Sequence, residues 1–121
     1  MADTLRSNLD ISAGTTDVEL STVANSATTY QTILSISLCN THATQDHTFD
    51  LYIKDVIGGH DGGGANTKYY LYMTQSLPAL STFVHNDKIM LQNDEELWMV
   101  LDSGTQGTAV HIVTSYLEQT A

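Results

Sequence analysis

The stretch Leu34-Ser35-Ile36-Ser37-Leu38-Cys39 alternates apolar residues with small, more polar ones. Because successive side chains of a β-strand point to opposite sides, this pattern predicts a half-buried strand over 30–39, with Leu34, Ile36 and Leu38 toward the core. The same alternation returns in four further segments, Phe49/Leu51/Ile53, Tyr69/Leu71/Met73, Leu97/Met99/Leu101 and Val110/Ile112. The chain is therefore predicted to be all-β.

Turn-forming residues separate these alternating segments. The expected strands cover 18–21, 30–39, 47–54, 67–73, 80–84, 88–91, 97–101 and 109–117. The polar segment 40–46 predicts a hairpin between its flanking strands, the glycine-rich segment 58–64 predicts a loop tip, and Pro78 predicts a strand end. About eight strands with turn signals about every 8 to 12 residues predict a β-sandwich with a jelly-roll-like topology.

The N-terminal segment 1–16 lacks a sustained period. Its apolar residues, Leu5, Leu9 and Ile11, are scattered among Asp, Ser, Asn, Gly and Thr. We predict an extended arm over 1–16 whose three apolar residues anchor it to a neighbouring chain, and a single sandwich domain over 17–121. A chain of 121 residues fits one such domain, because two cores would each be near the lower limit of independent stability.

Charge and composition restrict the classes of partner. Fourteen acidic residues against four basic ones give a formal net charge of -10, which repels a phosphate backbone and anionic lipids, so neither nucleic acid nor membrane is expected as a partner. The N-terminus has no basic stretch followed by an apolar segment, and no run reaches the roughly 18 apolar residues of a membrane span. Synthesis in a bacterial cytoplasm is expected, and the single cysteine, Cys39, is expected to be structural.

Residue patterns that carry chemistry are sparse. The five histidines, His42, His47, His60, His85 and His111, include no His-x-His pair, which a cupin-type metal site would present. Glu95 and Glu96 are adjacent, so a strand would turn them to opposite faces. The sequence has no Gly-x-Ser-x-Gly elbow, and the glycines at 62–64 lack a following Lys-Ser/Thr. We expect no enzyme activity, no catalytic residues, no metal and no cofactor.

Aromatic residues suggest a surface for contacts. Tyr70 and Tyr72 are predicted on one face of their strand, and Trp98 lies opposite the Leu97/Met99/Leu101 row. A strand that is apolar on both faces is covered by a second layer or by another chain. The predicted interface residues are Leu5, Leu9, Ile11, Tyr70, Tyr72 and Trp98, and the expected assembly is a homo-oligomer, a trimer.

Several segments together resemble a family of small all-β virion proteins of tailed bacteriophages, notably those of marine and cyanobacterial hosts. The similar segments are 33–41 (ILSISLCNT), 48–53 (TFDLYI), 77–79 (LPA), 86–89 (NDKI) and 113–118 (VTSYLE). They fall within residues 30 to 118, about three quarters of the chain. The resemblance implies a structural part of a virion and brings no catalytic residues.

The functional expectation follows from this resemblance and from the acidic composition. The first hypothesis is a non-enzymatic capsid decoration or cement protein, present in many copies, located in the virion and bound to other virion proteins such as the major capsid protein. The alternative is a receptor- or carbohydrate-binding module of a phage tail or fibre, in which aromatic side chains at loop tips would stack on sugar rings. Most aromatic residues here lie in predicted strands, which favours the structural role.

Overall fold

The computed structural model describes residues 2–12, 17–23, 28–56, 64–92, 94–101 and 110–120. These residues form nine β-strands and no helix. The strands are β1 (Ala2–Ser12), β2 (Val18–Val23), β3 (Thr29–Asn40), β4 (His47–Asp55), β5 (Thr67–Leu77), β6 (Thr82–His85), β7 (Ile89–Leu91), β8 (Glu95–Leu101) and β9 (Val110–Thr120). The described part of the chain accordingly has no helix long and apolar enough to cross a membrane.

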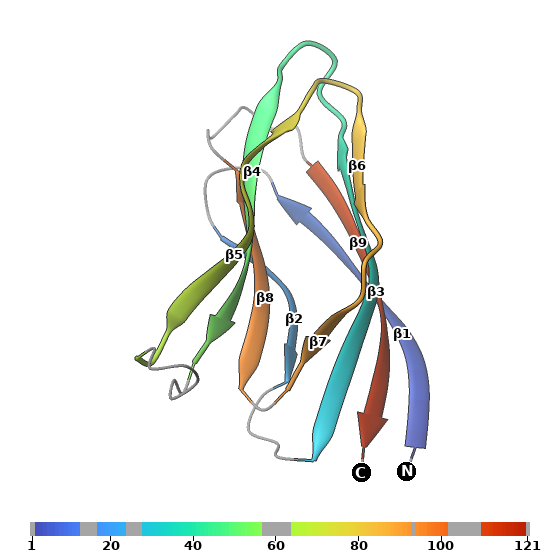
Figure 1. The fold of residues 1–121 in the computed structure, drawn as a ribbon. Helices are drawn as coiled ribbons and strands as arrows, with labels where there is room; N and C mark the ends of the chain where they lie inside the picture. Colours follow the sequence, from blue (N-terminus) through green and yellow to red (C-terminus); the bar gives the residue numbers. More distant parts are fainter. Residues whose placement is uncertain are drawn as a thin grey trace.

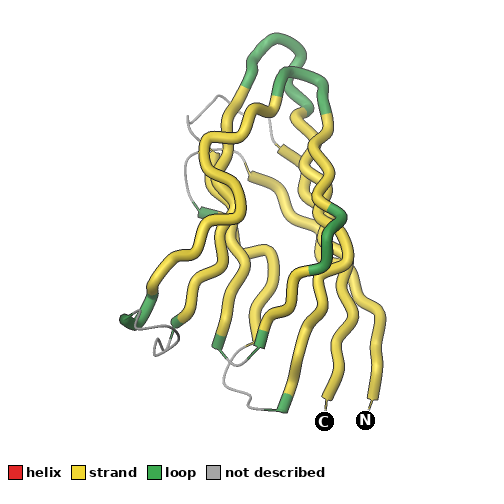
Figure 2. Tube along the Cα trace, viewed as in Figure 1, coloured by secondary structure: helices red, strands yellow, loops and turns green. Residues whose placement is uncertain are grey.

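The strands form two antiparallel sheets that face each other (Figure 1, Figure 2). Sheet A has the order β1-β9-β3-β6, and β7 pairs with β3 beyond β6; sheet B has the order β2-β8-β4-β5. Since β6 and β7 pair with successive parts of β3, they act as one interrupted strand. Four strands then face four, in the order of a jelly roll. The predicted all-β sandwich is confirmed.

One hydrophobic core fills the space between the sheets. Its buried residues are Leu20, Val23, Ile33, Ile36, Leu38, Phe49, Leu51, Leu77, Leu91, Leu97, Met99, Leu101, Val110, Ile112 and Tyr116. Phe49 of sheet B meets Phe83 of sheet A edge to face, with ring centroids 5.0 Å apart, a favoured aromatic arrangement. The inward assignment of the Leu97/Met99/Leu101 row is confirmed, because all three side chains are buried.

Strand β3 differs from the predicted alternation at one point. The pairing with β9 shifts register between Ile33 and Ser35, which marks a β-bulge. Ile33 is fully buried, whereas Leu34 is only half-buried. The prediction that Leu34 faces the core beside Ile36 and Leu38 is therefore wrong, because the extra residue in the bulge reverses the phase of the strand.

The connection between β3 and β4 is not a hairpin. β3 belongs to sheet A and β4 to sheet B, so residues 41–46 cross from one sheet to the other and the predicted hairpin is wrong. The buried Asn40 side chain holds this crossing in place: its Nδ2 donates to the Gln45 carbonyl at 2.9 Å and to the Leu77 carbonyl at 3.1 Å. Polar turn residues indicated a change of direction but not which sheet receives the next strand.

The N-terminal segment forms a strand where the sequence predicted an arm. Residues 2–12 are β1, which pairs with β9 along its whole length, from Ala2 opposite Thr120 to Ser12 opposite Val110. The alternation is weak because Arg6, Asn8 and Asp10 occupy the inward positions of this edge strand. Residues 13–16 and the segment 57–63, which contains most of the predicted glycine-rich loop and His60, lie outside the described residues.

Candidate functional site

The outer face of sheet A gathers most of the exposed apolar side chains. Strand pairing places Leu5, Leu9 and Ile11 of β1 beside Leu117, Val113 and His111 of β9. Leu5, Leu9 and Ile11 are 74%, 75% and 64% exposed. The uncharged face, as we define it, consists of Leu5, Ser7, Leu9, Ile11, Ser37, Cys39, Val84, Met90, His111, Val113, Ser115 and Leu117.

The charge of this face contrasts with that of the whole chain. None of the residues that define it is Asp, Glu, Lys or Arg, although the chain carries 14 acidic and four basic residues. Asp3, whose carboxylate accepts a hydrogen bond from Gln119 Nε2 at 3.3 Å, stands at one end of β1. A contiguous apolar face on an acidic protein indicates a contact surface, because scattered apolar residues would need no such explanation.

A hollow of about 280 Å³ lies on the uncharged face between β1 and β9, lined mainly by Leu9, Ile11, His111 and Val113. Its walls are apolar side chains and the imidazole of His111. The protruding Leu5 lies four residues before Leu9, on the same side of β1. The face therefore offers both a ridge and a depression to a partner.

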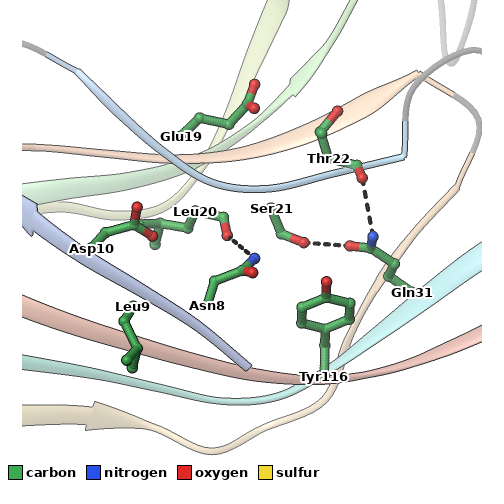
Figure 3. A pocket seen from close by; sticks show the side chains of 9 residues that line it. All are labelled: Asn8, Leu9, Asp10, Glu19, Leu20, Ser21, Thr22, Gln31 and Tyr116. Atoms are coloured by element: carbon green, nitrogen blue, oxygen red, sulfur yellow. Dashed lines mark hydrogen bonds between the residues drawn. The ribbon is translucent and has the colours of Figure 1, made fainter. Parts of the chain in front are cut away.

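A second, more polar pocket of about 330 Å³ lies between β1 and β2 (Figure 3). Asn8 Nδ2 donates to the Leu20 carbonyl at 2.8 Å and so links the two strands. Gln31 closes one side, since its Nε2 donates to the Thr22 carbonyl at 3.0 Å and its Oε1 accepts a hydrogen bond from Ser21 Oγ. Hydrogen bonds within the chain thus hold the side chains of Asn8, Ser21 and Gln31 in this pocket.

Two carboxyl groups of this pocket hold their protons more tightly than usual. Partial burial raises the pKa of Asp10. Partial burial also raises the pKa of Glu19, and the neighbouring Glu96 carboxylate adds to this effect while Lys54 opposes it. Within the described residues, no three His, Cys, Asp or Glu side chains are grouped so as to hold a metal ion.

The outer face of sheet B is aromatic but already covered by lysines. Lys54 Nζ lies 4.6 Å from the centroid of Trp98 and 3.5 Å from Glu96 Oε1, which also accepts a hydrogen bond from Trp98 Nε1 at 2.9 Å. Lys68 Nζ lies 4.8 Å from the ring of Tyr52. The cation–π contacts satisfy these rings within the chain.

Tyr52 is the most enclosed aromatic residue of this outer face. Its hydroxyl donates to the Asp17 carboxylate, and its ring centroid lies 5.5 Å from that of Tyr70. Burial, followed by the Asp17 carboxylate, raises the pKa of the Tyr52 hydroxyl. The sequence pattern does not distinguish Tyr52, because its position in an alternating strand identifies the face of the strand but not the neighbouring side chains that cover it.

The structure separates the residues that the sequence analysis named as interface residues. Tyr70 and Tyr72 were predicted on one face, but the pairing with β4 skips Leu71, and this bulge turns them to opposite sides. Tyr70 is 43% exposed on the outer face of sheet B, whereas Tyr72 packs against the core. Leu5, Leu9 and Ile11 lie together on β1 of sheet A, whereas Trp98 lies on β8 of sheet B.

The sequence missed the other nine residues of the uncharged face, among them the exposed side chains of Val84, Met90, His111 and Val113. The alternation of Val110 and Ile112 already placed His111 and Val113 on the outward side. What the sequence lacked was the pairing of β1 with β9, which brings these outward residues next to Leu9 and Ile11.

The four histidines among the described residues take structural positions or lie on the surface. His42 Nδ1 accepts hydrogen bonds from the backbone N–H groups of Thr44 and Gln45, at 3.2 and 3.0 Å. His85 Nδ1 lies 2.7 Å from the Tyr72 hydroxyl. His47 is buried, and His111 is exposed on the uncharged face.

Comparison with known proteins yields a similarity of fold. No protein family profile matches the chain, and no curated protein matches it in sequence. A chain in the solved structure of infectious bursal disease virus, strain Gx, superposes with a TM-score of 0.57 at 12% sequence identity. The alignment covers 100% of this chain and 34% of the viral chain, so the present chain spans about a third of the length of its structural neighbour.

Proposed function

We propose that the chain is a non-enzymatic structural protein of a virus particle that acts through protein–protein contacts. The observation that carries this proposal is the uncharged face: apolar side chains more than 60% exposed on β1 continue across β9 of a jelly roll whose net charge is -10. A face of this kind is typical of an assembly contact. The virus source of the structural neighbour supports the same conclusion, and jelly rolls are frequent in viral capsids.

The finer assignment is a capsid decoration or cement protein of a tailed bacteriophage, made in the bacterial host cytoplasm and incorporated in the virion as a homotrimer. The resemblance of segments 33–41, 48–53 and 113–118 to phage virion proteins supports it. The acidic remainder of the surface would keep such a protein away from packaged DNA until it docks on a partner such as the major capsid protein.

The rival assignment, a glycan-binding module of a tail or fibre, has less support. Sugar binding by stacking needs an open aromatic face, but on the outer face of sheet B Lys54 covers Trp98 and Lys68 covers Tyr52, which leaves Tyr70, 43% exposed, as the open ring beside them. To stack on Trp98 or Tyr52, a sugar ring would first have to displace a cation that contributes about 0.5 to 2 kcal/mol of favourable interaction.

Quantitative mass spectrometry of purified particles of the virus that encodes the chain tests the proposal. A decoration protein should be present in a fixed, high ratio to the major capsid protein. A few copies per particle would favour the tail or fibre assignment, and absence from intact particles would refute a virion role. Native mass spectrometry of the isolated chain should give the mass of a trimer, and a dimer would contradict the assigned stoichiometry.

A further inference from the structure

We propose that the uncharged face is the surface on which a second copy of this chain packs, with the hollow between β1 and β9 at the centre of the contact. This inference deepens the proposed function and rests on it, because it names the partner of the same face. The charge, the shape and the area of the face all favour this partner.

Charge favours a copy of this chain as the occupant. Two chains that each carry a net charge of -10 repel each other wherever their carboxylates approach within a Debye length, about 8 Å at physiological ionic strength. On the outer face of sheet A, no outward-pointing side chain is acidic over residues 5–11 of β1 or over residues 111–117 of β9. A basic partner would instead be attracted to acidic surface, so the face without carboxylates suits a partner as acidic as the chain itself.

Asp10 adds no charged side chain to the uncharged face, although it is one of the residues that line the hollow. Its carboxylate points to the opposite side of β1, toward Glu19 and the pocket between β1 and β2 (Figure 3). Leu9 points away from that pocket in the same view. A partner on the uncharged face would therefore meet Leu9 and not the Asp10 carboxylate.

Shape and area are adequate for a specific contact. The hollow of about 280 Å³ lies beside the ridge formed by Leu5 and Leu9, so a ridge of one copy has a depression of the other to enter. Four strands of up to about 11 residues make a face of roughly 700 Å² in plan. Specific interfaces bury about 600 to 1,000 Å² of accessible surface per partner, so the area of this face falls within that range.

The test compares two single substitutions at exposed strand positions, Leu9 at 75% and Met73 at 63% exposure. Leu9→Glu puts a carboxylate at the wall of the hollow between β1 and β9, and Met73→Glu puts the same carboxylate on β5 of the other sheet, where Met73 is 63% exposed. Sedimentation velocity from about 1 to 100 µM measures self-association, and circular dichroism with thermal unfolding confirms that each variant is folded. Leu9→Ser replaces Leu9→Glu if the charged variant does not fold.

We expect the wild-type chain and Met73→Glu to associate equally, and Leu9→Glu or Leu9→Ser to associate at least tenfold more weakly, as for truncation of a central interface residue. A wild-type chain that stays monomeric at 100 µM would overturn the inference, and so would unchanged association of the folded Leu9 variant. Equal weakening by Met73→Glu would show that any added carboxylate disrupts assembly, and would also overturn it.

The outcomes separate this inference from the proposed function. A monomeric chain that is nevertheless abundant in purified particles would refute self-association through the uncharged face and retain the virion role. A chain that associates through Leu9 but is absent from particles would refute the virion role and retain the interface.

Discussion

The bulge in β3 predicts that alanine substitutions at two neighbouring residues, Ile33 and Leu34, cost different amounts of unfolding free energy. Ile33 is 0% exposed, whereas Leu34 is half-buried beside the register shift. Ile33→Ala removes three buried carbon atoms, worth about 0.8 kcal/mol each by transfer, and the remaining cavity raises the loss of unfolding free energy to about 3 to 4 kcal/mol. Leu34→Ala should cost less, about 1 to 2 kcal/mol, because the Leu34 side chain is only partly buried and lies outside the core cluster.

Urea unfolding followed by the fluorescence of Trp98 measures both losses. With a slope of about 1 to 3 kcal/mol per molar, a loss of 3 kcal/mol lowers the midpoint by about 1 to 3 M for Ile33→Ala. All proteins should be compared at one chain concentration, since self-association would add to apparent stability. Equal losses, or a larger loss for Leu34→Ala, would show that the strand keeps the simple alternation and that the bulge is misplaced.

Three further predictions concern single side chains. Glu19→Gln should raise the melting temperature near pH 7 and leave it unchanged near pH 4. The pKa of Glu19 is raised in the folded chain, so folding favours the protonated carboxyl group and the folded state loses stability as the pH rises through that pKa. A difference in melting temperature that does not depend on pH would contradict this assignment. Asn40→Ala should cost about 2 to 4 kcal/mol in thermal or urea unfolding, since it leaves buried backbone partners of the β3–β4 crossing unsatisfied; Asn40→Ala with native stability would remove the proposed role. Lys54→Ala should shift the emission of Trp98 to longer wavelength, because the lysine that covers the indole is lost, and an unchanged spectrum would mean that the lysine does not cover the ring in solution.

The alternation in the sequence was sufficient for the class of fold and for much of the core. The buried residues that the patterns predicted correctly include Ile36, Leu38, Leu97 and Met99. The prediction works because side chains alternate between the two faces of a strand, so the alternation assigns each residue to one face. Pro78 likewise follows directly after the end of β5. Such local signals need no knowledge of which strand pairs with which.

The errors arise where one residue or one long-range pairing changes the outcome. The bulges near Leu34 and Leu71 each reverse a phase that the pattern carries forward, so Tyr72 was assigned to the surface although it packs on the core. β1 was missed because an edge strand with Arg6 and Asp10 on its inward side has little hydrophobic period. Only the pairing with β9 shows that it is a strand.

The same pairing shows why the uncharged face could not be predicted as a unit. Leu9 and Val113 are partners across β1 and β9 although more than a hundred residues separate them. Each looks like an isolated surface residue in the sequence. Their proximity depends on strand order, which composition and periodicity do not report.

The position of β9 has a consequence for how this chain folds. β9 lies between β1 and β3, and Thr120 pairs with Ala2 on one side and with Thr29 on the other (Figure 1). During synthesis, the strand edges of β1 and β3 that pair with β9 therefore stay unpaired until the residues of β9 leave the ribosome. Such late closure by sequence-distant strands is intrinsically slow, on the order of milliseconds to seconds, and exposes the nascent edges to mispairing between chains. β9 is thus the strand that joins β1 to the rest of sheet A.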